Sequence, residues 1–408
     1  MNKTRLKKYA NLIATVGVNV QKGQEVIIAA ELDQPEFVKM VVEECYKRGA
    51  KKVSVDWNYQ PLTRLNVRYC TEKVLGSMDK WQLEKWEHQA EVIPCKIYLM
   101  SEDPDGLNGI NQKKFAKAMA SRSKLIKPIR AKMENKYQWC IAAVPGKEWA
   151  KKIFPGERTS RAMELLWEAI LSTSRVNDDP IGAWNDHNAD LLNRCNYLNS
   201  LGIEELHITA GNGTDIKIGL INGVNFCGGG ENALGSGIYF NPNIPSEEVF
   251  TSPMKGKAEG IVYSSKPLAY AGVLIENFYI KFEGGKAVEV GAEKNEEALR
   301  QLIAMDEGAA YLGECALVPY SSPIRESGLL FYNTLFDENA ACHLALGRGF
   351  TNLVEGYENM TEDECHALGI NDSIVHEDFM IGTKDMNITA TCRDGKTVSI
   401  FKDGEWAF

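Results

Sequence analysis

Long apolar runs and an excess of positive charge are missing from this sequence of 408 residues, and we expect no secretory leader. No apolar stretch approaches the roughly 20 residues needed to span a bilayer, so the sequence predicts no transmembrane helix. The net charge of −9 argues against nucleic-acid or membrane partners, because both favour a basic surface. Residues 1–10 are charged and no apolar core segment follows them, so we expect a cytoplasmic protein.

Paired cysteines and nucleotide-binding fingerprints are missing as well. The ten cysteines are scattered, and none forms a Cys-x-x-Cys pair. In a long intracellular chain this spacing predicts reduced thiols that fill hydrophobic cores. No glycine fingerprint follows the first expected strand, and no Lys-Ser/Thr follows the glycine-rich residues 226–237. The sequence therefore gives no support for a dinucleotide or a phosphate site.

The composition is that of a globular protein long enough for two domains, with 44% hydrophobic and 25% charged residues. Residues 1–200 alternate helical and strand patterns, which predicts an α/β domain with a mainly parallel sheet. Residues 201–408 alternate polar and apolar positions more often, which predicts a β-rich α+β domain.

Individual elements are expected where the apolar period is clear. In the first half we expect helices at residues 2–20, 35–48, 159–174 and 181–200, and strands at 25–30, 52–56, 95–100 and 139–144. In the second half we expect strands at residues 207–210, 215–220, 278–282, 373–381 and 397–401, the last between the turn signals Asp394-Gly395 and Asp403-Gly404.

The most informative stretch is His376-Glu377-Asp378, within the apolar and β-branched residues 373–381. Side chains alternate along a strand, so His376 and Asp378 share one face and Glu377 takes the other. An imidazole and a carboxylate on one rigid face can supply half of a divalent metal site. Taken alone, a chance pattern on a solvated strand explains this tripeptide better.

Three further residues of ligand type stand in apolar settings. Glu248 lies between two prolines, Glu314 is the one charge in residues 309–319, and small apolar residues surround His343. A carboxylate is rarely buried without a partner, so each of these positions needs an explanation. A hydrogen bond in the core could explain any one of them, but together they favour a shared cation.

These stretches resemble the aminopeptidase T / aminopeptidase S family of metallo-aminopeptidases. The resemblance is carried by residues 243–253, Gly313-Glu314, residues 333–345 and His376-Glu377-Asp378. It implies a cytoplasmic, homodimeric enzyme that releases N-terminal amino acids from peptides through water activated by two metal ions. By motif, the ligands of two divalent ions (Zn, Co or Mn) would be Glu248, Glu314, His343, His376 and Asp378. Glu314 or Asp378 would bridge the ions.

One position departs from the family. Seven residues after the first metal-binding histidine the relatives carry a tyrosine, whereas this chain has Phe350, which keeps the ring and loses the hydroxyl. Arg325 and Arg348 are candidates to supply the positive charge for the oxyanion in its place. Glu247 and Glu338 are candidates for the general base, by proximity in sequence.

Other interpretations stay open at this point. The metal site could serve another two-metal amide or ester hydrolase, or it could be a structural site in a non-catalytic binding protein. Cys315 and Cys342 adjoin proposed ligands, and either could be a nucleophile. Residues 226–237 are interpreted as a flexible loop that closes over the metal cleft.

Overall fold

A computed structural model describes residues 2–408, which form two compact units. The first unit runs to Asn185 and also includes Gly230–Pro245. The second contains Asp186–Gly229 and Ser246–Phe408. The predicted division into domains after residue 200 stays a prediction.

A five-stranded parallel sheet forms the centre of the first unit, with strand order β10-β4-β3-β1-β2. Its strands are β1 (Glu25–Glu31), β2 (Lys52–Asn58), β3 (Cys95–Met100), β4 (Trp139–Ala143) and β10 (Asn243–Ile244). In β1 the side chains of Val26, Ile28 and Ala30 are buried, as the apolar run predicts. The predicted parallel sheet is confirmed. Its fifth strand comes from a distant segment that no local pattern indicates.

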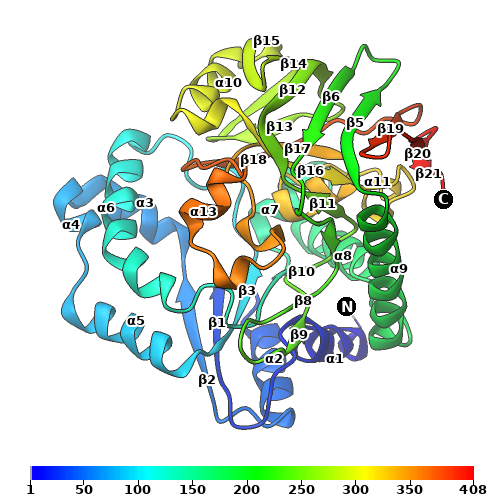
Figure 1. Ribbon diagram of the computed structural model, residues 1–408. Coiled ribbons are helices and arrows are strands. Elements are labelled where there is room, and N and C mark those ends of the chain that lie inside the picture. The colour runs from blue at the N-terminus through cyan, green and yellow to red at the C-terminus, as the bar shows by residue number, and fades with distance from the viewer. Residues whose placement is uncertain (1) are drawn as a thin grey trace. The chain divides into compact units, whose positions relative to one another are not determined.

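Helices lie on both sides of this sheet, and Figure 1 shows α1 and α2 on one side of the strands and α5 and α6 on the other. The α-helices that begin in this unit are α1 (Lys3–Leu12), α2 (Pro35–Lys47), α3 (Gln60–Tyr69), α4 (Glu72–Gly76), α5 (Lys80–Val92), α6 (Gln112–Ala131), α7 (Lys147–Ile153), α8 (Thr159–Thr173) and α9 (Pro180–Ser200). The helix expected at residues 2–20 is shorter: after α1 it continues as a π-helical turn, Ile13–Gly17. A small two-stranded sheet, β8 (Glu231–Asn232) with β9 (Tyr239–Phe240), completes the unit.

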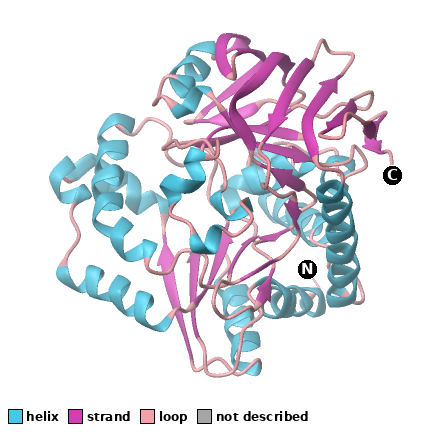
Figure 2. Cartoon of the chain, in the orientation of Figure 1, coloured by secondary structure: helices cyan, strands magenta, loops and turns pink. Residues whose placement is uncertain are grey.

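The second unit is rich in antiparallel strands, and its strand content is clear in Figure 2. Its larger sheet has the order β13-β14-β12-β6-β5-β19-β20-β21, with β15 paired to β14. These strands are β5 (Ile203–Thr209), β6 (Asp215–Leu220), β12 (Pro253–Tyr263), β13 (Leu268–Tyr270), β14 (Val273–Glu283), β15 (Lys286–Lys294), β19 (Asn387–Cys392), β20 (Thr397–Lys402) and β21 (Glu405–Trp406). The strands expected in the second half are therefore present, and the terminal hairpins turn at Asp394-Gly395 and Asp403-Gly404.

The smaller sheet has the order β18-β17-β16-β11-β7. Its strands are β7 (Cys227–Gly228), β11 (Val249–Thr251), β16 (Leu312–Leu317), β17 (His343–Gly347) and β18 (His376–Met380). Short helices lie around it: α10 (Glu296–Ile303), α11 (Pro323–Glu326), α12 (Thr334–Asp337) and α13 (Glu362–Ala367). Both sheets of this unit contribute side chains to one hydrophobic core, for example Phe278 from β14 and Phe379 from β18.

Two predictions, that the chain has no transmembrane helix and that its cysteines are reduced, can be compared with the described residues. Within residues 2–408 no helix is both long and apolar enough to cross a bilayer. The same residues contain no disulfide, and most of the cysteines are buried.

Candidate metal centre

All five predicted ligands lie on or beside the smaller sheet of the second unit. Glu248 directly precedes β11, Glu314 lies in the middle of β16, and His343 opens β17. His376 and Asp378 lie on β18. These four strands are consecutive neighbours in the sheet, so segments up to 130 positions apart in sequence meet on one surface.

The register of the sheet places the ligands on one face. Glu314 is opposite Ala345 on the neighbouring strand, and Ala345 is opposite Asp378 on the next. His343 and His376 each stand two residues before a member of this row, so their side chains point to the same face. The other face carries Cys315, Leu344 and Phe379, among others, and belongs to the hydrophobic core. A shift of one residue in any strand would move its ligands into that core.

Small residues separate the ligands on this face. Ala345 lies between Glu314 and Asp378, and Gly347 is opposite His376. Gly347 has φ +100°, and a Cβ there would lie 2.1 Å from the carbonyl oxygen of Val375. Only glycine fits this position without strain. The row therefore leaves space above the sheet between the carboxylates.

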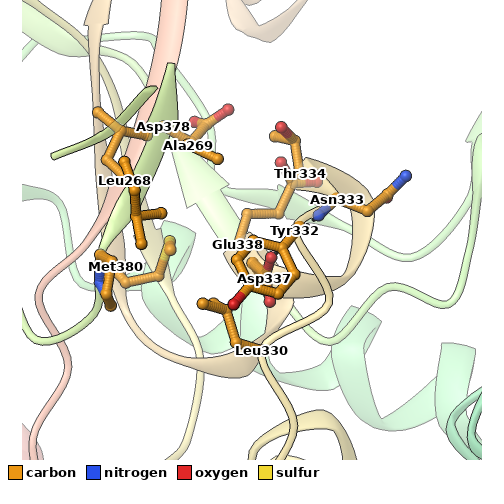
Figure 3. Close-up of a pocket in the computed structure, with 12 residues that line it drawn as sticks. Leu268, Ala269, Leu330, Tyr332, Asn333, Thr334, Asp337, Glu338, Asp378 and Met380 are labelled. Carbon is orange, nitrogen blue, oxygen red and sulfur yellow. Dashed lines mark hydrogen bonds between the residues drawn. The ribbon is translucent and has the colours of Figure 1, made fainter. Parts of the chain in front are cut away.

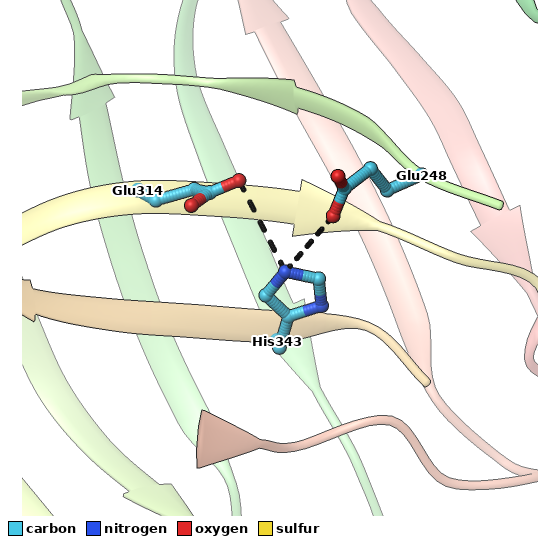
Figure 4. A group of neighbouring side chains, drawn as sticks. All are labelled: Glu248, Glu314 and His343. Atoms are coloured by element: carbon cyan, nitrogen blue, oxygen red, sulfur yellow. Dashed lines mark ion pairs between the residues drawn. The ribbon is translucent and has the colours of Figure 1, made fainter. Parts of the chain in front are cut away.

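The ligand atoms form two groups of three that share Glu314. In the first group, shown in Figure 4, Nε2 of His343 lies 3.2 Å from Oε2 of Glu248 and 4.0 Å from Oε1 of Glu314. In the second group, Nε2 of His376 lies 3.1 Å from Oε2 of Glu314 and 3.4 Å from Oδ1 of Asp378. Within each group the ligand atoms all lie within 4.8 Å of one another, which suits one cation per group.

The backbone fixes the orientation of both imidazoles. Nδ1 of His343 lies 3.1 Å from the carbonyl oxygen of Ala341, and Nδ1 of His376 lies 2.7 Å from that of Arg348. A carbonyl oxygen only accepts, so each Nδ1 carries the proton and donates it. In the neutral ring this leaves the Nε2 lone pair directed at the carboxylates, as in metal-bound histidines.

Buried charges strongly perturb this cluster. Burial raises the pKa of Glu314 to about 7; a hydrogen bond from His376 opposes the rise, and the charges of Asp378 and Glu248 add to it. Burial alone lowers the pKa of His343, but the hydrogen bond and charge of Glu248 outweigh it and bring the value to about 10. Neighbouring carboxylates thus favour positive charge at the centre, whether from protons or from metal ions.

Asp378 gives a direct test of whether the residues suit a metal. Its Oδ1 is buried, and Nε2 of His376 lies 3.4 Å away without the geometry of a hydrogen bond. Burial raises the pKa of this carboxyl, but the proximity and charge of His376 outweigh burial and lower it below its usual range. A buried, ionised carboxylate oxygen with only this distant partner is stabilised when a cation pairs with it. The residues therefore fit a divalent metal site.

The two sequence candidates for a general base lie in different surroundings. Glu338 is only partly exposed, and burial together with the charges of Asp378 and Glu248 raises its pKa well above the usual value. Oε2 of Glu247 instead lies 3.8 Å from Nε2 of His187. Glu338 therefore faces the ligand cluster, whereas Glu247 faces the helix α9.

Asn339 is a buried residue that the sequence interpretation missed. Its amide nitrogen donates to the carbonyl oxygen of Leu335 (3.0 Å) and to Oε1 of Glu338 (3.3 Å). Its Oδ1 accepts from the backbone N–H of Glu247 at 2.7 Å. It thereby ties the segment before β11 to the turn before β17. No pattern in the sequence distinguishes it, because it directly follows the two charged residues Asp337 and Glu338.

The remaining predicted residues lie beside the centre or are engaged elsewhere. The ring of Phe350 packs against the His376 ring, with centroids 5.1 Å apart, and against Phe250 at 5.3 Å. The Arg348 guanidinium lies 3.5 Å from Glu362, and its role toward an oxyanion stays a prediction. The same holds for Arg325, whose guanidinium lies over the ring of Tyr320, 3.8 Å from its centroid.

The cysteines and the glycine-rich segment have structural surroundings. Cys315 and Cys342 are buried in the hydrophobic core, and burial raises the pKa of each thiol, that of Cys342 to about 12. Both thiols are therefore protonated at neutral pH, which disfavours a nucleophilic role. Within residues 226–237, Cys227–Gly228 form the edge strand β7, and Glu231–Asn232 pair with β9 in the first unit. The segment predicted to be a flexible loop therefore contains two short strands.

Known proteins match this chain over nearly its whole length. The family described as thermophilic metalloprotease (M29) matches residues 2–406. Aminopeptidase AmpS of Bacillus subtilis is 42% identical over 406 residues, covering 99% of this chain and 98% of the relative. Aminopeptidase 2 of Geobacillus stearothermophilus is 39% identical over 405 residues, with the same coverage. The solved structure of wild-type AmpT from Thermus thermophilus superimposes with a TM-score of 0.91 at 37% identity and covers 100% of both chains.

Proposed function

Because the chain belongs to the thermophilic metalloprotease (M29) family, we propose that it is an aminopeptidase with a dinuclear metal centre that releases N-terminal amino acids from peptides. The observation that carries this proposal is the pair of three-residue groups on one sheet face that share Glu314. A single closed structural site would need four ligands around one ion, whereas two open groups leave positions for water and substrate.

Glu248, Glu314 and His343 would hold one metal ion, and Glu314, His376 and Asp378 the other. Their mixed nitrogen and oxygen donors suit Zn, Co or Mn. Three carboxylates meet two imidazoles in a largely buried place, and their charges raise the pKa of His343 to about 10, so the centre favours positive charge from protons or metal ions. When bound, two such ions polarise a substrate carbonyl and lower the pKa of a water molecule.

Other side chains of the protein would handle protons and orientation. Glu338 is the better candidate for the general base, because its carboxylate faces the ligand cluster and lies outside the two ligand groups. Asn339 holds that carboxylate through its amide N–H. The backbone carbonyls of Ala341 and Arg348 keep the imidazole protons on Nδ1, so the Nε2 atoms stay available as ligands.

The setting of the enzyme is also part of the proposal. We infer peptides with a free N-terminus as substrates, a cytoplasmic location, and a homodimer as the working assembly. The named relatives are aminopeptidases, which supports peptides as substrates, whereas the cytoplasmic location and the homodimer rest on the family resemblance. Light scattering at micromolar concentration tests the assembly, and a monomer there would contradict it.

Hydrolysis of a peptide panel tests the function. Free and N-acetylated versions of the same peptides are incubated with the metal-stripped protein and with added Co, Zn, Mn or Mg. We expect metal-dependent release of the first amino acid from the free peptides alone. Equal cleavage of the acetylated peptides, or of esters only, would instead indicate another two-metal hydrolase.

A matched variant separates the centre from a contaminating peptidase. Glu314→Gln keeps the size of the side chain and removes the charge shared by both ligand groups. Its activity should fall by at least ~100-fold, since both ions lose a ligand. Glu377→Gln is the control, because Glu377 lies on β18 and its side chain points to the face opposite the ligands His376 and Asp378.

A further inference from the structure

A small, partly open pocket adjoins the candidate metal centre within the second unit, and Figure 3 shows it. Its polar end is formed by Asp378 and Glu338. Its walls combine the apolar residues Leu268, Ala269, Leu330 and Met380 with the polar residues Asn333 and Thr334. It holds a volume of about 50 Å³. None of these residues has a role in metal binding except Asp378.

The pocket continues the ligand-bearing face of the sheet. Met380 lies two residues after Asp378 on β18, so the two side chains point to the same face. Met380 is also directly opposite His343 on β17. The Met380 side chain therefore lies directly beside two proposed ligands, Asp378 on its own strand and His343 on the neighbouring strand. Anything bound at the centre has this apolar side chain beside it.

A fixed turn closes the other side of the pocket. The carboxylate of Asp337 accepts the backbone N–H groups of Phe331 at 2.9 Å and Asn333 at 3.0 Å. These bonds occupy both oxygens and hold Leu330 and Tyr332 in place at the pocket wall. Although Asp337 lines the pocket, its charge is therefore committed to the turn. Leu268, Leu330 and Met380 therefore offer an apolar side chain a contact surface, while Asn333 and Thr334 keep part of the wall polar.

The volume limits the size of that occupant. An apolar cavity of ~150 Å³ holds one benzene ring, so a pocket of about 50 Å³ is too small for a phenyl ring. Valine and leucine side chains have three and four carbon atoms, whereas the phenylalanine side chain has seven. A peptide backbone cannot pass through so small a space, but one aliphatic side chain fits.

We propose that this pocket binds the side chain of the N-terminal residue of the substrate and selects short aliphatic side chains over aromatic ones. The inference rests on the proposed aminopeptidase function. The scissile carbonyl belongs to the N-terminal residue, so that residue's side chain starts one bond away from the reacting carbon. A carbonyl at the metal centre places this side chain at the mouth of the pocket between Asp378 and Glu338.

Two opposite substitutions test the assignment. Leu330→Ala removes three carbon atoms from a partly exposed wall residue, and Ala269→Leu adds three at an exposed one. Leu192→Ala, at an exposed position on α9, is the matched control. The kcat/KM values are compared for aminoacyl substrates that share one leaving group and carry Ala, Leu or Phe. Thermal unfolding of each variant checks that it is folded.

We expect the parent to prefer Leu over Phe. Leu330→Ala should raise the Phe/Leu ratio by ~10-fold or more, and Ala269→Leu should shift preference toward Ala by a similar factor. The control should keep the parent ratios. An active parent whose ratios stay unchanged in both variants would overturn the pocket assignment and leave the aminopeptidase function standing.

A second substrate series distinguishes the remaining alternative. Dipeptides with Leu first and a varied second residue should show no change in preference in either variant. A change confined to this series would overturn the assignment, because the pocket would then bind the residue after the cleaved bond. Failure of the parent to cleave any free aminoacyl substrate with any metal would overturn the proposed function, and the pocket assignment with it.

Discussion

Replacing Ala345 by valine should weaken metal binding by ~100-fold or more while leaving the protein folded. Ala345 is the middle member of the row Glu314–Ala345–Asp378, one residue from each of three neighbouring strands. Neighbouring strands are ~4.8 Å apart, so the two carboxylate-bearing residues are ~10 Å apart and converge above the alanine methyl group. Two further methyl groups at this position fill the space in which the carboxylates meet.

The magnitude follows from two separate costs. Overpacking a buried strand position costs ~1–3 kcal/mol of unfolding free energy. At a metal concentration of 100 times Kd, binding stabilises the parent by ~2.7 kcal/mol, and a 100-fold weaker variant gains only ~0.4 kcal/mol. The difference corresponds to ~5–9 °C in Tm for a domain of ~200 residues. The metal-dependent part is thus large enough to measure apart from the packing cost.

Thermal unfolding with and without added Zn, Co or Mn is the assay, together with calorimetric titration of the metal-free protein. Ala390→Val is the control, because Ala390 is fully buried on β19 of the same unit and away from the ligands. Both variants should lose basal stability, but only the Ala345 variant should lose the metal-dependent rise in Tm. Parent-like metal affinity in Ala345→Val would refute the placement of the ions above this row.

Three further outcomes are expected. Phe350→Tyr should raise kcat by up to ~100- to 1,000-fold with little change in KM if the family hydroxyl stabilises the transition state; a kcat within about twofold of the parent would show that the ring serves to pack against His376. Gly347→Ala should lose ~3 kcal/mol of unfolding free energy because its Cβ meets the Val375 carbonyl, whereas Gly356→Ala, at φ +78° with open space, should lose ~1 kcal/mol in the same denaturation experiment. Chelation should lower the Tm of the parent and abolish activity, with both restored by a divalent metal and neither restored by monovalent salt.

Local patterns identified some of the strands and the residues of ligand type, whereas the long strands β12, β15 and β19 and the ligand-bearing strands β16 and β17 were not expected. The alternation in residues 373–381 predicted that His376 and Asp378 share a face, and β18 has that arrangement. Glu314 stood out because it is a charge in an apolar run, and β16 is indeed buried along its whole length. Alternation and burial are properties of a single segment, so a single segment can reveal them.

Relations between segments could not be obtained in the same way. The sequence does not show that Glu314 and Asp378 flank Ala345, because that depends on the pairing of three strands. The register shift between Leu312 and Glu314 is equally invisible, although it decides which face Glu314 takes. The two-residue strands β7 and β10 were missed for the same reason. So short a strand is defined by its hydrogen bonds to a neighbouring strand and leaves no periodic pattern in the sequence.

The two histidines show how the sheet itself prepares the centre. The partner of each Nδ1 is a backbone carbonyl, from Ala341 just before β17 and from Arg348 just after it. Substituting either side chain leaves these carbonyls in place, so the orientation of both rings depends on the strand ends and not on any particular second side chain. Many metal-bound histidines are instead held by a carboxylate, which also raises their basicity. Here the nearby carboxylates remain free to serve as ligands, and the fold alone keeps the two Nε2 atoms directed at Glu314.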